Sequence, residues 1–202
     1  MSPYLLLVIL WVLYFLLHSL FARPWMKEWF ARHLRWLLPH YRLLYSLGSG
    51  LGLVGILFYN AVVSHERLLP EEEGTYRYVG MMLATFSVIV FRQSFRVYSF
   101  QEFVGLKPVT EHTADQGGLK THGILAQVRH PLYLGILLLI VGFWFYIPTI
   151  ANLITAVVII IYLFVGIRLE ERDLEQQFGE AYREYRRKVP MIIPKLGKNR
   201  HQ

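Results

Sequence analysis

The sequence contains no cysteine, which excludes disulfide bonds, thiolate metal sites and cysteine nucleophiles. Charged residues are scarce as well: they make up 17% of the 202 residues, against 54% for apolar and aromatic ones. This composition excludes a disordered chain, a collagen-like chain and a disulfide scaffold. With a mean hydropathy of +0.36, the chain is also too apolar for an ordinary soluble domain, and we expect a polytopic membrane protein.

Motifs of the common soluble enzymes are also missing. No GxGxxG motif follows an expected strand and no GxxxxGKS motif occurs, so neither a Rossmann domain nor a P-loop is supported. The eight histidines show no HExxH spacing, so we expect no metal. The sequence has no internal repeat, no low-complexity region and no separate soluble domain. We therefore predict a single membrane domain over residues 1–202.

Three apolar segments in the first half predict membrane spans. Residues 3–21 contain no Asp, Glu, Lys or Arg, and their length and uncharged start favour a permanent span over a signal peptide. Residues 41–63 contain glycines that let a neighbouring helix approach closely. Residues 76–100 form the third predicted span. Arg92 and Arg96 lie four residues apart on one face of it, so its last turns either leave the lipid, with both side chains snorkelling, or face a polar cavity.

The last apolar block is too long for one crossing, and Pro148 divides it. We predict a helical hairpin with arms at residues 131–146 and 148–167. Residues 169–188 follow with an apolar stripe at helical spacing, which predicts an amphipathic helix. The expected fold class is therefore all-α: a polytopic integral membrane protein with about five transmembrane helices, a C-terminal helical hairpin and an amphipathic cytoplasmic tail helix.

Basic residues alternate between the connecting segments. Residues 22–42 hold five Lys or Arg against one acid, whereas residues 64–77 hold two against four. Residues 91–130 hold five Lys or Arg, and the tail from residue 168 onward holds nine. The positive-inside rule then places the N-terminus outside and the tail and active site in the cytoplasm. The net charge of +7 predicts membrane lipid, and no nucleic acid, as a partner, and the compact size favours a bacterial inner membrane over the endoplasmic reticulum.

The stretch GGLKTHGILAQVRHPLYLG, residues 117–135, is the most informative one for chemistry. It places Arg129, His130 and Tyr133 at the cytoplasmic end of the fourth predicted span. Pro131 suits the first turn of a helix, where free backbone N–H groups and the positive end of the helix dipole lie. This end therefore predicts a recognition point for a carboxylate or a phosphate.

The predicted hairpin brings two carboxylates to the same place. A chain that crosses the membrane and returns puts Glu170 and Glu171 near Arg129 and His130. Such a cluster suits a zwitterionic or cationic ligand that carries a carboxylate. Simpler roles stay open at this point: membrane anchors for the two basic residues, a solvated helical turn for the two glutamates, and an interfacial position for Tyr133.

Two segments carry a resemblance to a known family. RHPLYLG (129–135), followed after the hairpin by EERDLEQQFGEAYREYRRKVPMIIP (170–194), resembles the isoprenylcysteine carboxyl methyltransferase family. Phospholipid N-methyltransferases and bacterial membrane thiol S-methyltransferases show related forms. The first half of the chain is similar to this family only in being helical and membranous. The chain departs from the family pattern at Leu125, where tyrosine is frequent.

The resemblance implies S-adenosylmethionine as the methyl donor, bound at the cytoplasmic face by residues 117–194 without a Rossmann domain. The first motif would line one side of the donor pocket, Gly135 would allow close approach, and the glutamates would close the other side. The donor-binding residues implied are His122, Gly123, Arg129, His130, Tyr133, Gly135, Glu170 and Glu171. The residues expected to act on the reaction itself are Glu171 and, for orienting an acidic acceptor, Arg92 and Arg96.

The expected function is that of an integral membrane methyltransferase that uses S-adenosylmethionine on a small or lipophilic acceptor. Methyl transfer is an in-line displacement, so the main task of the protein is alignment. The VPMIIP and EERDL segments favour a thiol over an isoprenylcysteine-like carboxyl group as acceptor. Two alternatives stay open: a nicotinamide-dependent reductase of the sterol reductase type, and a non-catalytic membrane scaffold or sensor in which Arg129 and Glu171 merely pair with each other.

Overall fold

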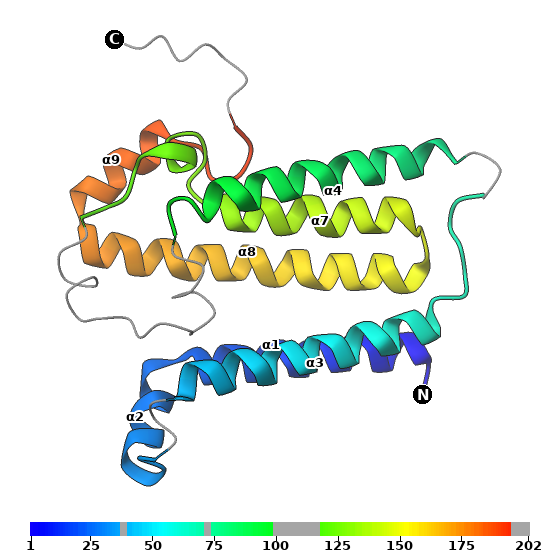
Figure 1. Ribbon diagram of the computed structural model, residues 1–202, viewed down its shortest axis with the longest axis horizontal. Helices are drawn as coiled ribbons and strands as arrows, with labels where there is room; N and C mark the ends of the chain where they lie inside the picture. Colours follow the sequence, from blue (N-terminus) through cyan, green and yellow to red (C-terminus); the bar gives the residue numbers. More distant parts are fainter. Residues whose placement is uncertain (37–39, 71–73, 99–117, 195–202) are drawn as a thin grey trace.

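The computed structural model describes residues 1–36, 40–70, 74–98 and 118–194, and these residues are organised by helices (Figure 1). The elements in chain order are α1 (Pro3–Ala22), α2 (Pro24–His33), α3 (Tyr41–Val63), α4 (Thr75–Ser94), the 3-10 helix η3 (Gly123–Ala126), α7 (Pro131–Tyr146), α8 (Ile150–Phe178) and α9 (Glu180–Lys188). The predicted all-helical fold is confirmed for the described residues.

The long helices form two pairs on either side of α8. Helices α1 and α3 lie side by side, α4 and α7 lie side by side, and α8 runs between the two pairs (Figure 1). The ends of α1 and α3 that adjoin α2 point to the same end of the bundle as α9 and the start of α7. This arrangement places the residues of interest for chemistry at one end of the molecule.

The predicted spans over residues 3–21, 41–63 and 131–146 coincide with α1, α3 and α7. The third predicted span was too long, because α4 ends at Ser94 and the chain turns through residues 95–98. Residues 99 and 100 of that prediction lie outside the described residues.

The helix predicted over residues 169–188 is divided between two helices of the structure. Helix α8 begins just after Pro148, where the Thr149 side chain accepts a hydrogen bond from the Asn152 N–H, and it continues without interruption to Phe178. The residues after Ile167 are charged, but none of them is a helix breaker. The break comes instead at Gly179, whose φ of +54° is a backbone conformation that glycine adopts readily. The charged turns of α8 therefore extend rigidly beyond its apolar part.

Three of the described helices, α1, α3 and α8, are long and apolar enough to cross a membrane. Helix α7 is apolar but has only 16 residues. Helix α4 packs along α7 (Figure 1). The number of five spans stays a prediction.

Paired polar side chains join α1, α3 and α8 near the end of the bundle remote from α9. Trp11 Nε1 donates to Thr155 Oγ1 at 3.0 Å, and Thr155 Oγ1 donates to Asn60 Oδ1 at 2.8 Å. Asn60 Nδ2 donates in turn to Asn152 Oδ1 at 2.6 Å. Interhelical hydrogen bonds of this kind hold helices together in lipid, where apolar packing alone gives little preference for a partner. They fix the α1–α3 pair against α8.

Candidate active site

An ion pair joins the start of α7 to the charged end of α8. Arg129 Nε and Nη2 both donate to Glu171 Oε1, at 2.9 and 2.6 Å. The two side chains are only 7% and 9% exposed. His130 caps α7 and Pro131 occupies its first turn, so the helix begins directly after Arg129. Because α7 and α8 form an antiparallel hairpin, residues 42 positions apart meet at one end of the bundle.

His130 lies between the two glutamates. Its Nε2 is 3.2 Å from Glu171 Oε1, and its Nδ1 is 3.7 Å from Glu170 Oε2. The His130 ring packs edge-on against the Tyr133 ring, with 5.5 Å between centroids. The side chain of Glu170 is 45% exposed, whereas that of Glu171 is buried. Glu170 is therefore the carboxylate that remains open to a ligand.

Glu171 lies four residues beyond Ile167, where the apolar part of α8 ends. Burial alone would favour the neutral acid, but hydrogen bonds from Arg129 and His130 outweigh it and lower the pKa of the Glu171 carboxyl. The pair with Arg129 is thus ionised at neutral pH. Removing one partner of a buried ion pair leaves an uncompensated buried charge, which strongly destabilises the fold.

The segment after α9 is tied to the residues before α7. The backbone N–H groups of Arg129 and His130 donate to the carbonyls of Pro190 and Met191, at 2.9 and 3.0 Å. Arg129 Nη1 also donates to the carbonyls of Arg186 (3.1 Å) and Val189. We call residues 189–192 the tail strap. The tail strap was not predicted from the sequence. Pro190 and Pro194 are the signal that could have indicated it, because a residue before proline favours extended backbone.

Tyrosines surround the open carboxylate. Burial raises the pKa of Tyr98, and nearby Glu170 raises it further. Burial also raises the pKa of Tyr182 and of Tyr185 to about 12. All three hydroxyls are therefore neutral at physiological pH. The Tyr185 hydroxyl donates to the Leu125 carbonyl of η3 at 2.6 Å, whereas the buried Tyr182 hydroxyl has no hydrogen-bond partner among the described residues. Tyr182 and Tyr185 belong to the apolar stripe predicted over residues 169–188, whereas Tyr98 was not among the expected site residues.

A family model described as phospholipid methyltransferase matches residues 75–181, which is more than half of the chain. The chain belongs to the phospholipid methyltransferase family. The matched region of this family member contains the ion pair, His130, Glu170 and the hairpin that brings them together. The resemblance found in the sequence is thereby confirmed.

Named relatives fall into two groups. Methanethiol S-methyltransferase 1 of Bradyrhizobium diazoefficiens is 36% identical over 198 residues, which cover 93% of this chain and 65% of the relative. Methanethiol S-methyltransferase of Crocosphaera subtropica is 34% identical, with coverage of 90% and 71%. Protein-S-isoprenylcysteine O-methyltransferase of Schizosaccharomyces pombe is 34% identical over 97 residues, or 48% of this chain and 39% of the relative. The chain thus spans about two thirds of the length of the methanethiol relatives. No solved structure matches.

The other residues expected in the site of this methyltransferase family member are His122, Gly123 and Gly135. His122 and Gly123 are exposed at the start of η3. Gly123 has a φ of +64°, and a Cβ there would lie 3.2 Å from Val97. The close approach that Gly135 permits is to α4, because a Cβ would lie 2.7 Å from the Phe91 ring. Leu125, where the family often has tyrosine, is buried.

Arg92 and Arg96 are both exposed. Among the described residues, neither forms a hydrogen bond or ion pair with the Arg129–Glu171 pair. Their expected part in orienting an acceptor stays a prediction. Both named groups of relatives are methyltransferases, which favours methyl transfer over the reductase and over a scaffold.

Proposed function

We propose that this protein is an S-adenosylmethionine-dependent thiol S-methyltransferase of the bacterial inner membrane, with its active site at the cytoplasmic end of the bundle. The observation that carries the donor assignment is Glu170, a half-exposed carboxylate held beside a buried Arg129–Glu171–His130 cluster inside the family-matched region. The observation that carries the acceptor assignment is the extent of the two alignments.

The residues present fit the proposed donor. Its ammonium group and ribose hydroxyls need a carboxylate, which Glu170 offers, and its adenine and sulfonium suit neutral aromatic faces such as Tyr98 and Tyr133. Together these groups supply a carboxylate and aromatic faces at one end of the bundle.

Arg129 has little hydrogen-bonding capacity left for direct contact with the donor. Its side chain has five N–H donors, and the contacts with Glu171, Arg186 and Val189 engage Nε, both donors of Nη1 and one donor of Nη2. At most one N–H remains for a donor carboxylate. We therefore assign Arg129 and Glu171 to positioning: they hold His130, Glu170 and the tail strap in place.

Little chemistry is required of the protein itself. When bound, the donor would supply an electrophilic methyl group on a positively charged sulfur, with a neutral thioether as the leaving group, and the acceptor would supply the thiolate. Glu170 holds the polar end of the donor, and the tyrosines fix the remainder. The rigid extension of α8 beyond the lipid keeps Glu170 and Glu171 in register with α7. Alignment of this kind supplies a large part of the rate enhancement in displacement reactions.

The first prediction concerns donor affinity. Titration of S-adenosylmethionine into the purified full chain should show saturable binding by calorimetry. Glu170→Gln should weaken it about ten- to hundredfold, because a charge-assisted hydrogen bond contributes about 1.5–3 kcal/mol. Glu184→Gln is the matched control, since Glu184 is exposed and its ion pair is with Lys188 on the same helix, and its affinity should equal that of the wild type. Absence of donor binding in the wild type would refute the proposed donor.

The second prediction concerns the acceptor. Alignments with the methanethiol methyltransferases cover 93% and 90% of this chain, whereas the isoprenylcysteine alignment covers 48%. The N-terminal half is therefore shared with thiol-directed relatives. In a panel assayed by methyl transfer from labelled donor, small alkyl and aryl thiols should be methylated on sulfur, and a prenylated cysteine should gain no methyl ester. Ester formation on the prenylated cysteine, with no reaction of the thiols, would overturn the acceptor assignment.

A further inference from the structure

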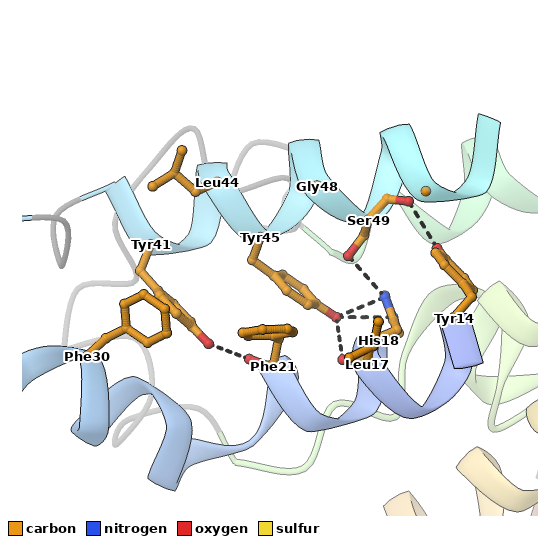
Figure 2. Close-up of a pocket in the computed structure, with 11 residues that line it drawn as sticks. Tyr14, Leu17, His18, Phe21, Phe30, Tyr41, Leu44, Tyr45, Gly48 and Ser49 are labelled. Carbon is orange, nitrogen blue, oxygen red and sulfur yellow. Dashed lines mark hydrogen bonds between the residues drawn. The ribbon is translucent and has the colours of Figure 1, made fainter. Parts of the chain in front are cut away.

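A cavity lies outside the family-matched region. A cavity of about 380 Å³ opens between α1 and α3 and is bounded at one end by Phe30 of α2 (Figure 2). Leu17 and Phe21 of α1 and Leu44 of α3 supply much of its apolar wall. Its volume is at the small end of the range of about 300–1,000 Å³ that is usual for ligand pockets. The cavity has room for a small apolar molecule.

One pole of this cavity is polar. His18 Nδ1 lies 3.2 Å from Ser49 Oγ, and the Tyr45 hydroxyl lies 3.1 Å from both ring nitrogens of His18 (Figure 2). The described residues that line the cavity include no Lys, Arg, Asp or Glu. The lining therefore offers nothing to pair with a phosphate or a carboxylate. It fits an uncharged occupant with one weakly polar group.

Tyr162 of α8 connects this cavity to the candidate active site. Its hydroxyl lies 3.0 Å from Ser19 Oγ, and its ring stacks on Phe15 with 3.9 Å between centroids. On the other side, Tyr162 and Tyr133 are close enough to interact electrostatically, and Tyr133 interacts in the same way with Glu170. The helix parts that line the cavity, the C-terminal part of α1 and the N-terminal part of α3, lie at the same end of the bundle as the C-terminal end of α8 (Figure 1).

We propose that the cavity between α1 and α3 binds the methyl acceptor, an uncharged alkyl or aryl thiol, with its S–H directed at His18. This inference rests on the proposed thiol methyltransferase function. The cavity belongs to the N-terminal half, which the family match at residues 75–181 leaves out and which the methanethiol methyltransferases share. A thiol combines an apolar body with a weak S–H donor. Imidazole is the strongest uncharged acceptor in the lining.

Gly48 allows the cavity to be filled without disturbing the surrounding helices. It lines the cavity, and a Cβ built on it meets nothing within 4 Å. Gly50 lies on the same helix, also has nothing within 4 Å, and is not part of the lining. Gly48→Leu and Gly50→Leu are therefore a matched pair: the same added side chain enters the cavity in one case and open space in the other.

The test measures binding of phenylmethanethiol, an alkyl thiol that keeps its S–H at neutral pH, to the purified full chain by calorimetry, without methyl donor. Gly48→Leu should weaken binding at least about tenfold and raise the KM for the thiol, with donor affinity unchanged. Gly50→Leu should change none of these values. Gly48→Ala and Gly48→Val complete a graded series, in which affinity should fall as side-chain volume rises. Unchanged thiol binding across that series would overturn the proposal, and so would equal loss of thiol and donor binding.

A second variant tests the part assigned to His18. The wild type should bind phenylmethanethiol more tightly than its methyl thioether, which has no S–H group, and His18→Phe should abolish this preference. If the cavity instead holds a lipid acyl chain, filling it leaves the thiol KM unchanged, which contradicts the proposal. Thiol binding without any donor binding would refute the proposed function and leave the cavity assignment intact. Donor binding together with no effect of the Gly48 substitutions would refute the cavity assignment and leave the proposed function intact.

Discussion

Replacing Arg129 by alanine should lower the free energy of unfolding by about 3–5 kcal/mol and abolish donor binding. The substitution leaves the buried Glu171 carboxylate without its partner and leaves the carbonyls of Arg186 and Val189 without their donor. Both losses loosen the tail strap and the turn of α8 that carries Glu170. The measurement is denaturant unfolding in detergent micelles, followed by far-ultraviolet circular dichroism, together with donor titration.

Two further variants separate stability from function at this pair. Arg183→Ala removes an arginine whose ion pairs with Glu175 and Glu180 are exposed, so its effect should stay within about 1 kcal/mol. The double variant Arg129→Leu/Glu171→Leu removes both buried charges and should recover part of the lost stability. It should nevertheless bind no donor. An Arg129→Ala protein as stable as the Arg183→Ala protein would contradict the role assigned to the pair.

The sequence was sufficient to predict the hairpin and, from it, the meeting of Arg129 and Glu171. A single proline within an apolar block marks the turn, and an antiparallel return then brings the two motifs to one end. The bounds of α1, α3 and α7 follow from apolar runs of limited length. These features depend on residue type and spacing, and both can be read directly from a sequence.

Other parts of the site could not be predicted in this way. The tail strap is held by backbone hydrogen bonds between residues about 60 positions apart, such as Arg129 and Pro190. Backbone hydrogen bonds do not depend on side-chain type, so residue types do not reveal them. The break at Gly179 depends on a positive φ, which the glycine permits but does not require. The cavity between α1 and α3 is lined by aromatic side chains and by Gly48 and Gly52, which have no side chain. It becomes visible only when two helices are docked.

Alanine at Gly80 or at Gly142 should destabilise the protein by about 1–3 kcal/mol each, because these glycines set the distance between α4 and α7. A Cβ at Gly80 would lie 2.6 Å from the Gly142 carbonyl oxygen, and one at Gly142 would lie 2.8 Å from the Gly80 carbonyl oxygen. The obstructing atoms are backbone, so the helices themselves must move apart. The double variant should be less destabilised than the sum of the single ones, because both act at one contact.

Alanine at Gly50 or Gly55 of α3 is the control, since a Cβ there meets nothing within 4 Å. These variants should be neutral or stabilising by up to about 1 kcal/mol, because alanine favours a helix over glycine. The same measurement should therefore show a lower free energy of unfolding for the Gly142 variant of α7 and an equal or higher one for the Gly50 and Gly55 variants of α3. Equal stability of the Gly142→Ala and Gly55→Ala proteins would show that the α4–α7 distance is not set by backbone contact.

The Gly142→Ala variant should also weaken donor binding, although Gly142 lies about 18 Å along α7 from His130. Helix α4 leads into Val97 and Tyr98, which lie against Gly123 and close to Glu170. A shift of α4 away from α7 moves these residues relative to the open carboxylate. The affinity for S-adenosylmethionine, measured by calorimetry on the folded fraction, should fall in Gly142→Ala and stay constant in Gly55→Ala. A change in the packing of α4 against α7 at one end of these helices would then lower donor affinity at the other end.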